Sequence, residues 1–104
     1  MNPNAAAKLG IKPFDAAEYL HTKEDCAQYL EACLESAPDD AALFSKALGN
    51  IARAKGMAQL ARDANLSREG LYKALGEQGN PSFGTVLKVM QALGLRVHVE
   101  AVPG

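Results

Sequence analysis

The sequence has little of what metal sites and disulfide frameworks are made from. It contains no tryptophan, two histidines and two cysteines among 104 residues. Cys26 and Cys33 are seven residues apart in an expected helix, so they lie about 10 Å apart on one face, too far for a disulfide bond. We therefore expect two reduced core thiols in a cytoplasmic protein, and neither a metal site nor a cofactor.

Long apolar runs and catalytic motifs are also missing. No apolar stretch approaches the roughly 20 residues that a membrane span requires, and the N-terminus lacks the pattern of a signal peptide. There is no glycine-rich phosphate loop and no nucleophile elbow, and Glu18, His21 and Asp25 form no catalytic set without a pocket. We therefore expect a protein that is not an enzyme.

Charge is distributed unevenly along the chain, although the net charge is only −1. Residues 1–48 carry four lysines against eight acidic residues, and residues 49–104 carry seven basic residues against four acidic ones. Phosphate binding depends on the local patch of positive charge and not on the net charge of the chain. The basic half is therefore compatible with binding to a nucleic acid. The acidic half indicates either a second, basic partner or simply a solvated face.

The pattern predicts a flexible tail over residues 1–13 and a single domain over 14–104. An acidic arm and helix occupy residues 14–40, in which Thr22 caps a helix that ends near Ser36.

Residues 41–94 are expected to form the helical core. Asp39 caps its first helix and Ser82 caps its last, which Gly94 terminates. The apolar residues of that last helix expected to face inward are Phe83, Val86, Leu87, Met90 and Leu93.

Residues 57–76 predict two short helices joined by a tight turn. Asn65 stands at the turn, where it tolerates a left-handed backbone, and Ser67 is a suitable N-cap for the second helix. Ala61 and Gly70 are small residues expected where the two helices cross. This arrangement is a helix-turn-helix, which is typical of DNA-binding proteins.

One face of the second helix is polar and spans about 140° of the helical wheel. The candidate DNA-binding residues are Gln59, Ser67, Arg68, Glu69, Tyr72 and Lys73. Arg68, near the helix N-terminus, is the first candidate for a bidentate contact to guanine. Glu69 either accepts from a cytosine amine or orients Arg68, whereas Lys73 and Gln59 suit contacts to the DNA backbone.

Residues 95–102 alternate apolar and polar side chains, which predicts a β-strand. A lone strand is unstable and needs a partner. That partner is either the arm near Phe14 or the same strand in a second subunit, which would make the protein a homodimer.

The order of helix, helix-turn-helix, Asn-Pro-Ser loop and capped final helix over about residues 41–95 resembles the Cro/C1-type, lambda-repressor-like DNA-binding domain. The resemblance implies an all-α bundle of about five helices, here with a short C-terminal strand. Met57 stands where many such domains have a glutamine that holds a phosphate, and Gln59 follows two residues later.

The segments FDAAEYL (14–20), LSREGLYKAL (66–75) and GNPSFGTVLKVMQALGL (79–95) resemble the addiction-module antidotes. These are antitoxins paired with a small RelE/HigB-like toxin. The resemblance implies a protein that binds operator DNA, represses its own operon and neutralises the toxin.

The candidate toxin-binding residues are Phe14, Tyr19 and Leu20, unless they fold back onto the domain. The alternatives are a stand-alone Cro/C1-type regulator without a toxin, and an interaction protein that has lost DNA binding.

Overall fold

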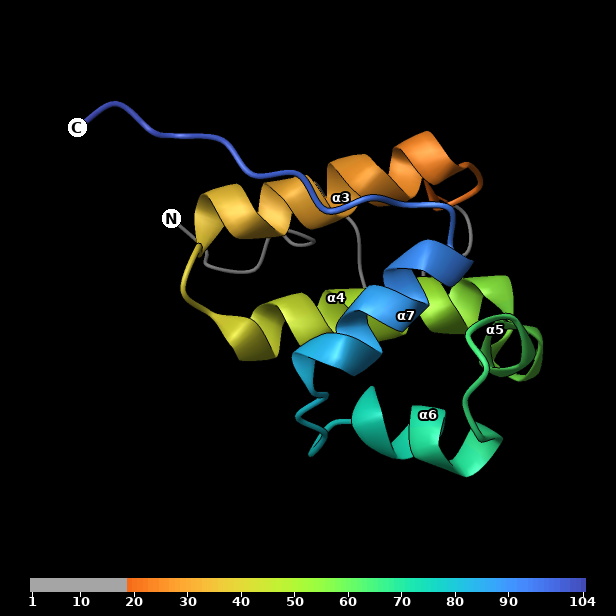
Figure 1. Ribbon diagram of the computed structural model, residues 1–104. Coiled ribbons are helices and arrows are strands. Elements are labelled where there is room, and N and C mark those ends of the chain that lie inside the picture. The colour runs from red at the N-terminus through yellow and green to blue at the C-terminus, as the bar shows by residue number, and fades with distance from the viewer. Residues whose placement is uncertain (1–18) are drawn as a thin grey trace.

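The structure is a computed structural model that describes residues 19–104, and this part of the chain contains five helices (Figure 1). Their bounds are α3 (Lys23–Ser36), α4 (Ala41–Lys55), α5 (Met57–Asp63), α6 (Arg68–Ala74) and α7 (Phe83–Ala92). Helices α3 and α4 pack side by side, and α6 lies at the opposite end of the domain from α3. The all-α expectation is confirmed for these residues.

Three helices begin at the polar caps that the sequence predicts, whereas α4 begins at Asp40, one residue after the predicted cap Asp39. Asp40, Ser67 and Ser82 each accept a hydrogen bond from the backbone N–H three residues later, at 2.9–3.1 Å. Thr22 forms a complete capping box, because its hydroxyl accepts from Asp25 N while the Asp25 carboxylate accepts from Thr22 N. These backbone hydrogen bonds lower the pKa of Asp25, because they stabilise its charged form.

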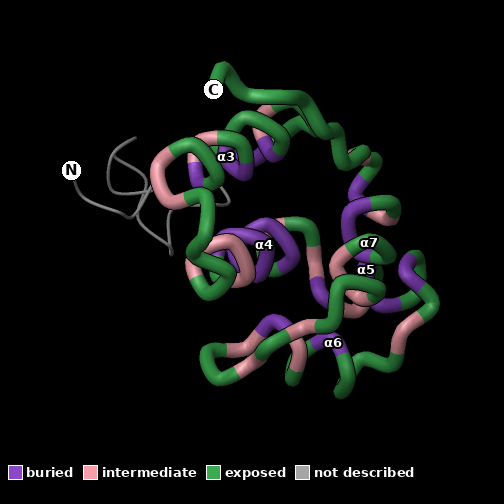
Figure 2. Tube along the Cα trace, turned by 60° about the vertical axis from the view of Figure 1, so that its left-hand side comes forward, coloured by how far each residue is buried: buried purple, intermediate pink, exposed green. Residues whose placement is uncertain are grey.

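The core gathers the apolar faces of the helices, as the buried stretches in Figure 2 show. Its largest fully buried side chains are Cys26, Cys33, Leu48, Ile51, Leu71 and Val89. Both cysteines are free, as predicted, and burial raises the pKa of each thiol.

A buried polar link joins α3 to α4. The Asn50 side-chain amide donates to the Tyr29 hydroxyl at 3.1 Å, and Arg53 donates to the Asn50 amide oxygen at 2.9 Å. Burial raises the pKa of the Tyr29 hydroxyl. The link satisfies a buried amide that would otherwise cost free energy, so it fixes how the two helices meet.

The inward face of α7 differs from the prediction. Phe83 is 69% exposed and Leu87 is also exposed, whereas Val89, which the prediction omitted, is fully buried. Met90 and Leu93 are buried as expected. A helix with apolar residues around much of its circumference admits more than one inward stripe, and packing selects one of them.

The expectation for Gly70 is also wrong. Gly70 is exposed, and a Cβ atom built on it would meet only the Ser67 hydroxyl oxygen. Ala61 is buried, so of these two small residues only Ala61, on α5, belongs to the core.

The predicted C-terminal strand is not formed within residues 19–104. Residues 95–104 run as an extended chain alongside α3 without strand pairing to any described residue (Figures 1 and 2). The sequence pattern reports which side chains alternate, but a strand also requires a hydrogen-bonded neighbour. In the same part of the chain, no helix combines the length and apolarity that crossing a bilayer requires.

Candidate nucleic-acid interface

The turn between α5 and α6 has the backbone that the sequence predicts. Asn65 has a positive φ of 57°. The Leu66 N–H donates to the Ala61 carbonyl at 2.9 Å, and the Leu66 side chain packs against the core. Asn is among the few non-glycine residues that adopt this conformation readily, so the direction in which the chain enters α6 is set locally.

One face of α6 is anchored in the domain. Leu71 and Leu75 are buried in the core. A Cβ atom on Gly49 of α4 would lie 2.8 Å from the Leu75 carbonyl oxygen, so the backbone of α4 closely approaches the end of α6. Because this contact leaves no room for a side chain at position 49, a glycine there lets the backbone of α4 meet the C-terminal end of α6.

The opposite face of α6 is open to solvent and carries the predicted polar group. Its five members are all exposed: Ser67, Arg68, Glu69, Tyr72 and Lys73. Gly70 is exposed among them, which leaves the backbone there accessible. The sequence therefore grouped these side chains on one surface correctly.

Arg68 and Tyr72 contact each other on this face. The Arg68 guanidinium carbon lies 5.8 Å from the centre of the Tyr72 ring, a cation–π distance. Of the two neighbours that could orient Arg68, it is the tyrosine ring that contacts the guanidinium. The planar guanidinium keeps its donor groups available for a bidentate acceptor such as guanine or phosphate.

Ser67 keeps hydrogen-bonding capacity although it caps the helix. Its oxygen accepts from Gly70 N at 2.9 Å, which leaves the hydroxyl proton free to donate to an acceptor. Lys73, in the last turn of α6, adds a second positive charge with three donors. Together the exposed groups can bind an anionic, hydrogen-bonding surface.

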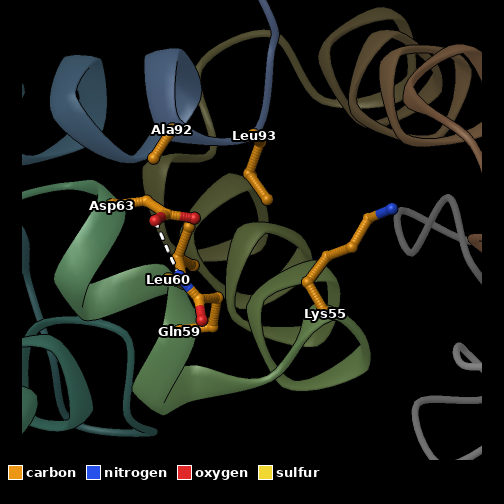
Figure 3. Close-up of a pocket in the computed structure, with 6 residues that line it drawn as sticks. All are labelled: Lys55, Gln59, Leu60, Asp63, Ala92 and Leu93. Carbon is orange, nitrogen blue, oxygen red and sulfur yellow. Dashed lines mark hydrogen bonds between the residues drawn. The ribbon is translucent and has the colours of Figure 1, made fainter.

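Gln59 lies on α5, where its side chain is engaged by other residues of the same helix. Its side-chain amide donates to Asp63 at 2.8 Å, and its oxygen accepts from Arg62 at 2.8 Å. Figure 3 shows Gln59 beside a pocket that α5 shares with the ends of α4 and α7, lined in addition by Lys55, Leu60, Asp63, Ala92 and Leu93. Arg62 is exposed beside Gln59 and was not among the predicted DNA-binding residues. Its positive charge within the expected helix-turn-helix was the sequence feature that pointed to it.

The predicted toxin-binding residues have different environments. Tyr19 is exposed, whereas Leu20 is 4% exposed and belongs to the core, so Leu20 has folded back onto the domain. Phe14 and the tail predicted over residues 1–13 lie outside the described residues. The outward face of α3 is acidic with an apolar margin: it presents Glu24, Glu31 and Glu35, with Ala27 and Leu34 along one side.

Comparison with known proteins identifies the class of the chain. The sequence profile of a family described as "probable addiction module antidote protein" matches residues 10–101. A protein of Haemophilus influenzae (strain ATCC 51907 / DSM 11121 / KW20 / Rd), described as an uncharacterized protein, is 52% identical over 90 residues, which cover 86% of this chain and 91% of that protein. No solved structure matches significantly. The chain therefore belongs to the family of addiction-module antidote proteins.

Proposed function

We propose that this chain is the antitoxin of a type II toxin–antitoxin module. It binds operator DNA through a lambda-repressor-like helix-turn-helix formed by α5 and α6, acts as a homodimer, represses its own operon, and neutralises a RelE/HigB-like toxin by binding it. Membership of the antidote family supports the antitoxin role. The observation that carries DNA binding is the exposed polar face of α6, held against the core by Leu71.

In this proposal α6 enters the major groove and Arg68 reads a guanine. The arginine lies in the first turn of the helix, where base contacts of such motifs concentrate. Its stack on Tyr72 restricts its orientation before DNA binds, so less conformational entropy is lost on binding. Glu69 then accepts from a cytosine amine, and Lys73 contacts phosphate, which positions the helix without specifying sequence.

Gln59 is a secondary contact in the proposal. Its amide is already bound to Asp63, a carboxylate that would repel a nearby phosphate. A phosphate contact by Gln59 therefore requires this bond to be exchanged, and the neighbouring Arg62 supplies the compensating positive charge.

The experiment that tests DNA binding is fluorescence anisotropy on the duplex directly upstream of the chain's own operon. A scrambled duplex of the same composition is the control, and both are titrated at two salt concentrations. The proposal predicts tighter binding to the upstream duplex at both salts. Equal, weak binding to both duplexes, with and without the neighbouring gene product, would contradict it.

The toxin is proposed to bind the outward face of α3, defined by Glu24, Ala27, Glu31, Leu34 and Glu35, with Tyr19 as a further apolar anchor. A toxin that handles RNA is expected to be basic, so the three glutamates steer its association. Leu34 is 47% exposed, which is enough apolar surface to anchor a contact at the edge of the acidic face. Leu20 is left out of this surface because it is buried.

Binding of the small basic protein encoded beside this gene tests the toxin surface. Leu34→Ala and Glu31→Lys are expected to weaken the complex about tenfold or more, measured by isothermal titration calorimetry. Lys88→Glu on α7 is the control for an equally large charge change elsewhere. Unchanged affinity for both α3 variants, with folded protein, would remove α3 from the interface.

A further inference from the structure

The C-terminal segment Leu95–Val102, which follows α7, forms no strand within the described part of the chain but has the sequence of one. We propose that it pairs with the same segment of a second copy as a two-stranded antiparallel ribbon centred on His98. The inference rests on the proposed homodimer and supplies its interface.

The apolar row of the segment becomes more exposed along its length. Leu95 packs against the core, Val97 is 43% exposed and Val99 is 86% exposed. Val102, beyond the row, is 81% exposed. β-Branched residues at alternate positions suit a half-buried pleated surface, so this row suits being covered by a partner that residues 19–104 of the same chain do not supply.

The backbone of the segment is likewise unpaired within residues 19–104. The Leu95 N–H donates to the Met90 carbonyl at 2.8 Å, but no residue between 19 and 104 bonds to the backbone of residues 96–104. Gly94, with a φ of 77°, ends α7, and Pro103 cannot donate to a ladder. Among the described residues, the stretch between them is therefore a bounded strand edge whose backbone donors and acceptors are unpaired.

Charge complementarity selects a second copy as the occupant. In an antiparallel ribbon centred on His98, Arg96 of each copy lies directly opposite Glu100 of the other. Two ion pairs result, one on either side of a central pair of His98 residues. On the other face, Val97 lies opposite Val99 and Leu95 opposite Ala101, so every apolar residue meets an apolar one.

Other registers lose this match. Moving the centre to Val97 places Glu100 opposite Gly94, and moving it to Val99 places Arg96 opposite Val102. A parallel, in-register pair sets Arg96 against Arg96 and Glu100 against Glu100, which is repulsive. The antiparallel register centred on His98 is thus the self-complementary one.

The position of the segment fits a dimer contact. It runs alongside α3, at the other end of the domain from α6 (Figures 1 and 2). A two-stranded ribbon is marginal by itself, but here Leu95 anchors each strand to a folded domain. Pairing at this end leaves the polar face of α6 uncovered in both copies.

A charge-reversal set tests the register on the full chain. Arg96→Glu and Glu100→Arg each turn two attractive pairs into repulsive ones, and both residues are exposed, so the domain itself should be unaffected. We expect each variant to weaken the dimer on the order of tenfold in sedimentation equilibrium. An equimolar mixture of the two, and the double variant, should restore it, while Lys88→Glu leaves it unchanged.

Disulfide trapping tests the same register without relying on charge. His98→Cys places two cysteines directly opposite each other at a Cα distance that a disulfide spans. Val102→Cys is the matched control, because its two cysteines would lie about 27 Å apart along the ribbon. The native cysteines are buried and should not interfere.

The expected result is a dimer of wild-type protein and rapid oxidation of His98→Cys to a covalent dimer, with little from Val102→Cys. A monomeric wild-type chain overturns the proposal. So does a dimer that survives both charge reversals but dissociates in Phe83→Ser, because the exposed Phe83 of α7 would then be the contact. These measurements need no DNA, so loss of DNA binding alone leaves the result distinguishable from failure of the proposed function.

Discussion

The Arg68 guanidinium stacks over the Tyr72 ring one turn away on α6, with 5.8 Å between the guanidinium carbon and the ring centre. Both side chains are exposed, and the contact joins the strongest hydrogen-bond donor of this face to its aromatic residue. Glu69 was one residue expected to orient Arg68, but in the structure the Tyr72 ring contacts it. Substitution of Tyr72, rather than of Glu69, is therefore expected to disturb the position of Arg68.

Removal of the ring is expected to reduce selectivity for the proposed operator. Tyr72→Ala frees Arg68 to sample other rotamers, so the specific complex should lose about 0.5–1 kcal/mol from the stack, in addition to any contact of the ring with DNA. Tyr72→Phe keeps the stack and is the matched control. Anisotropy titrations on upstream and scrambled duplexes measure the difference; equal behaviour of the two variants would mean that the stack is irrelevant to binding.

The close approach of α4 to α6 makes Gly49 sensitive to substitution. Gly49→Ala places a Cβ 2.8 Å from the Leu75 carbonyl oxygen, so backbone must move and the free energy of unfolding should fall by about 1–3 kcal/mol. Gly84→Ala on α7 is the control, since its nearest neighbour is the Ser82 hydroxyl oxygen at 3.8 Å. Urea denaturation should show little change or a gain for Gly84→Ala. Two similar curves would mean that α4 and α6 do not touch so closely.

The local features of this fold were predicted from the sequence more accurately than its tertiary contacts. The caps at Thr22 and Ser67 and the left-handed Asn65 were predictable because each depends on a few neighbouring atoms. Phe83 was misassigned to the core because the apolar pattern of α7 allows two inward stripes, and only packing decides between them.

The predictions for the candidate site show the same difference between local and tertiary features. Helical geometry grouped Arg68, Tyr72 and Lys73 correctly on one exposed face. Leu20 required knowledge of tertiary packing, since nothing in its local sequence distinguishes an interface residue from a core residue. The strand over 95–102 was predicted from the alternation of apolar and polar residues alone. Alternation within one segment does not specify the strand with which that segment pairs.

Stability should decline at alkaline pH through the buried thiols. Burial raises the pKa of Cys26 and Cys33 in the folded protein above that in the unfolded chain. Their contribution to stability is therefore complete below the pKa of a free thiol, about 8.5, and is lost as pH rises through the folded-state pKa. The melting temperature should fall between neutral pH and pH of about 10, with Tyr29 adding to the loss at the upper end.

Alkylation provides the check on that assignment. At pH 8, iodoacetamide should modify the two cysteines slowly in the native protein and quickly in denaturant, because the thiolate is the reactive form. Rapid modification of the native protein at both sites, together with a melting temperature that does not change with alkaline pH, would contradict the buried, protonated state.

The most direct test of the central claim compares Arg68→Ala with Lys73→Ala on upstream and scrambled duplexes over a range of salt. If α6 reads DNA, Arg68→Ala costs about 1–3 kcal/mol on the upstream duplex and much less on the scrambled one. Lys73→Ala should weaken both alike and reduce the salt dependence by about one phosphate contact. Lys23→Ala, on α3 at the far end of the domain, should leave both affinities nearly unchanged. If Arg68→Ala instead weakens both duplexes equally, or neither, α6 does not read sequence and the proposed repressor role fails.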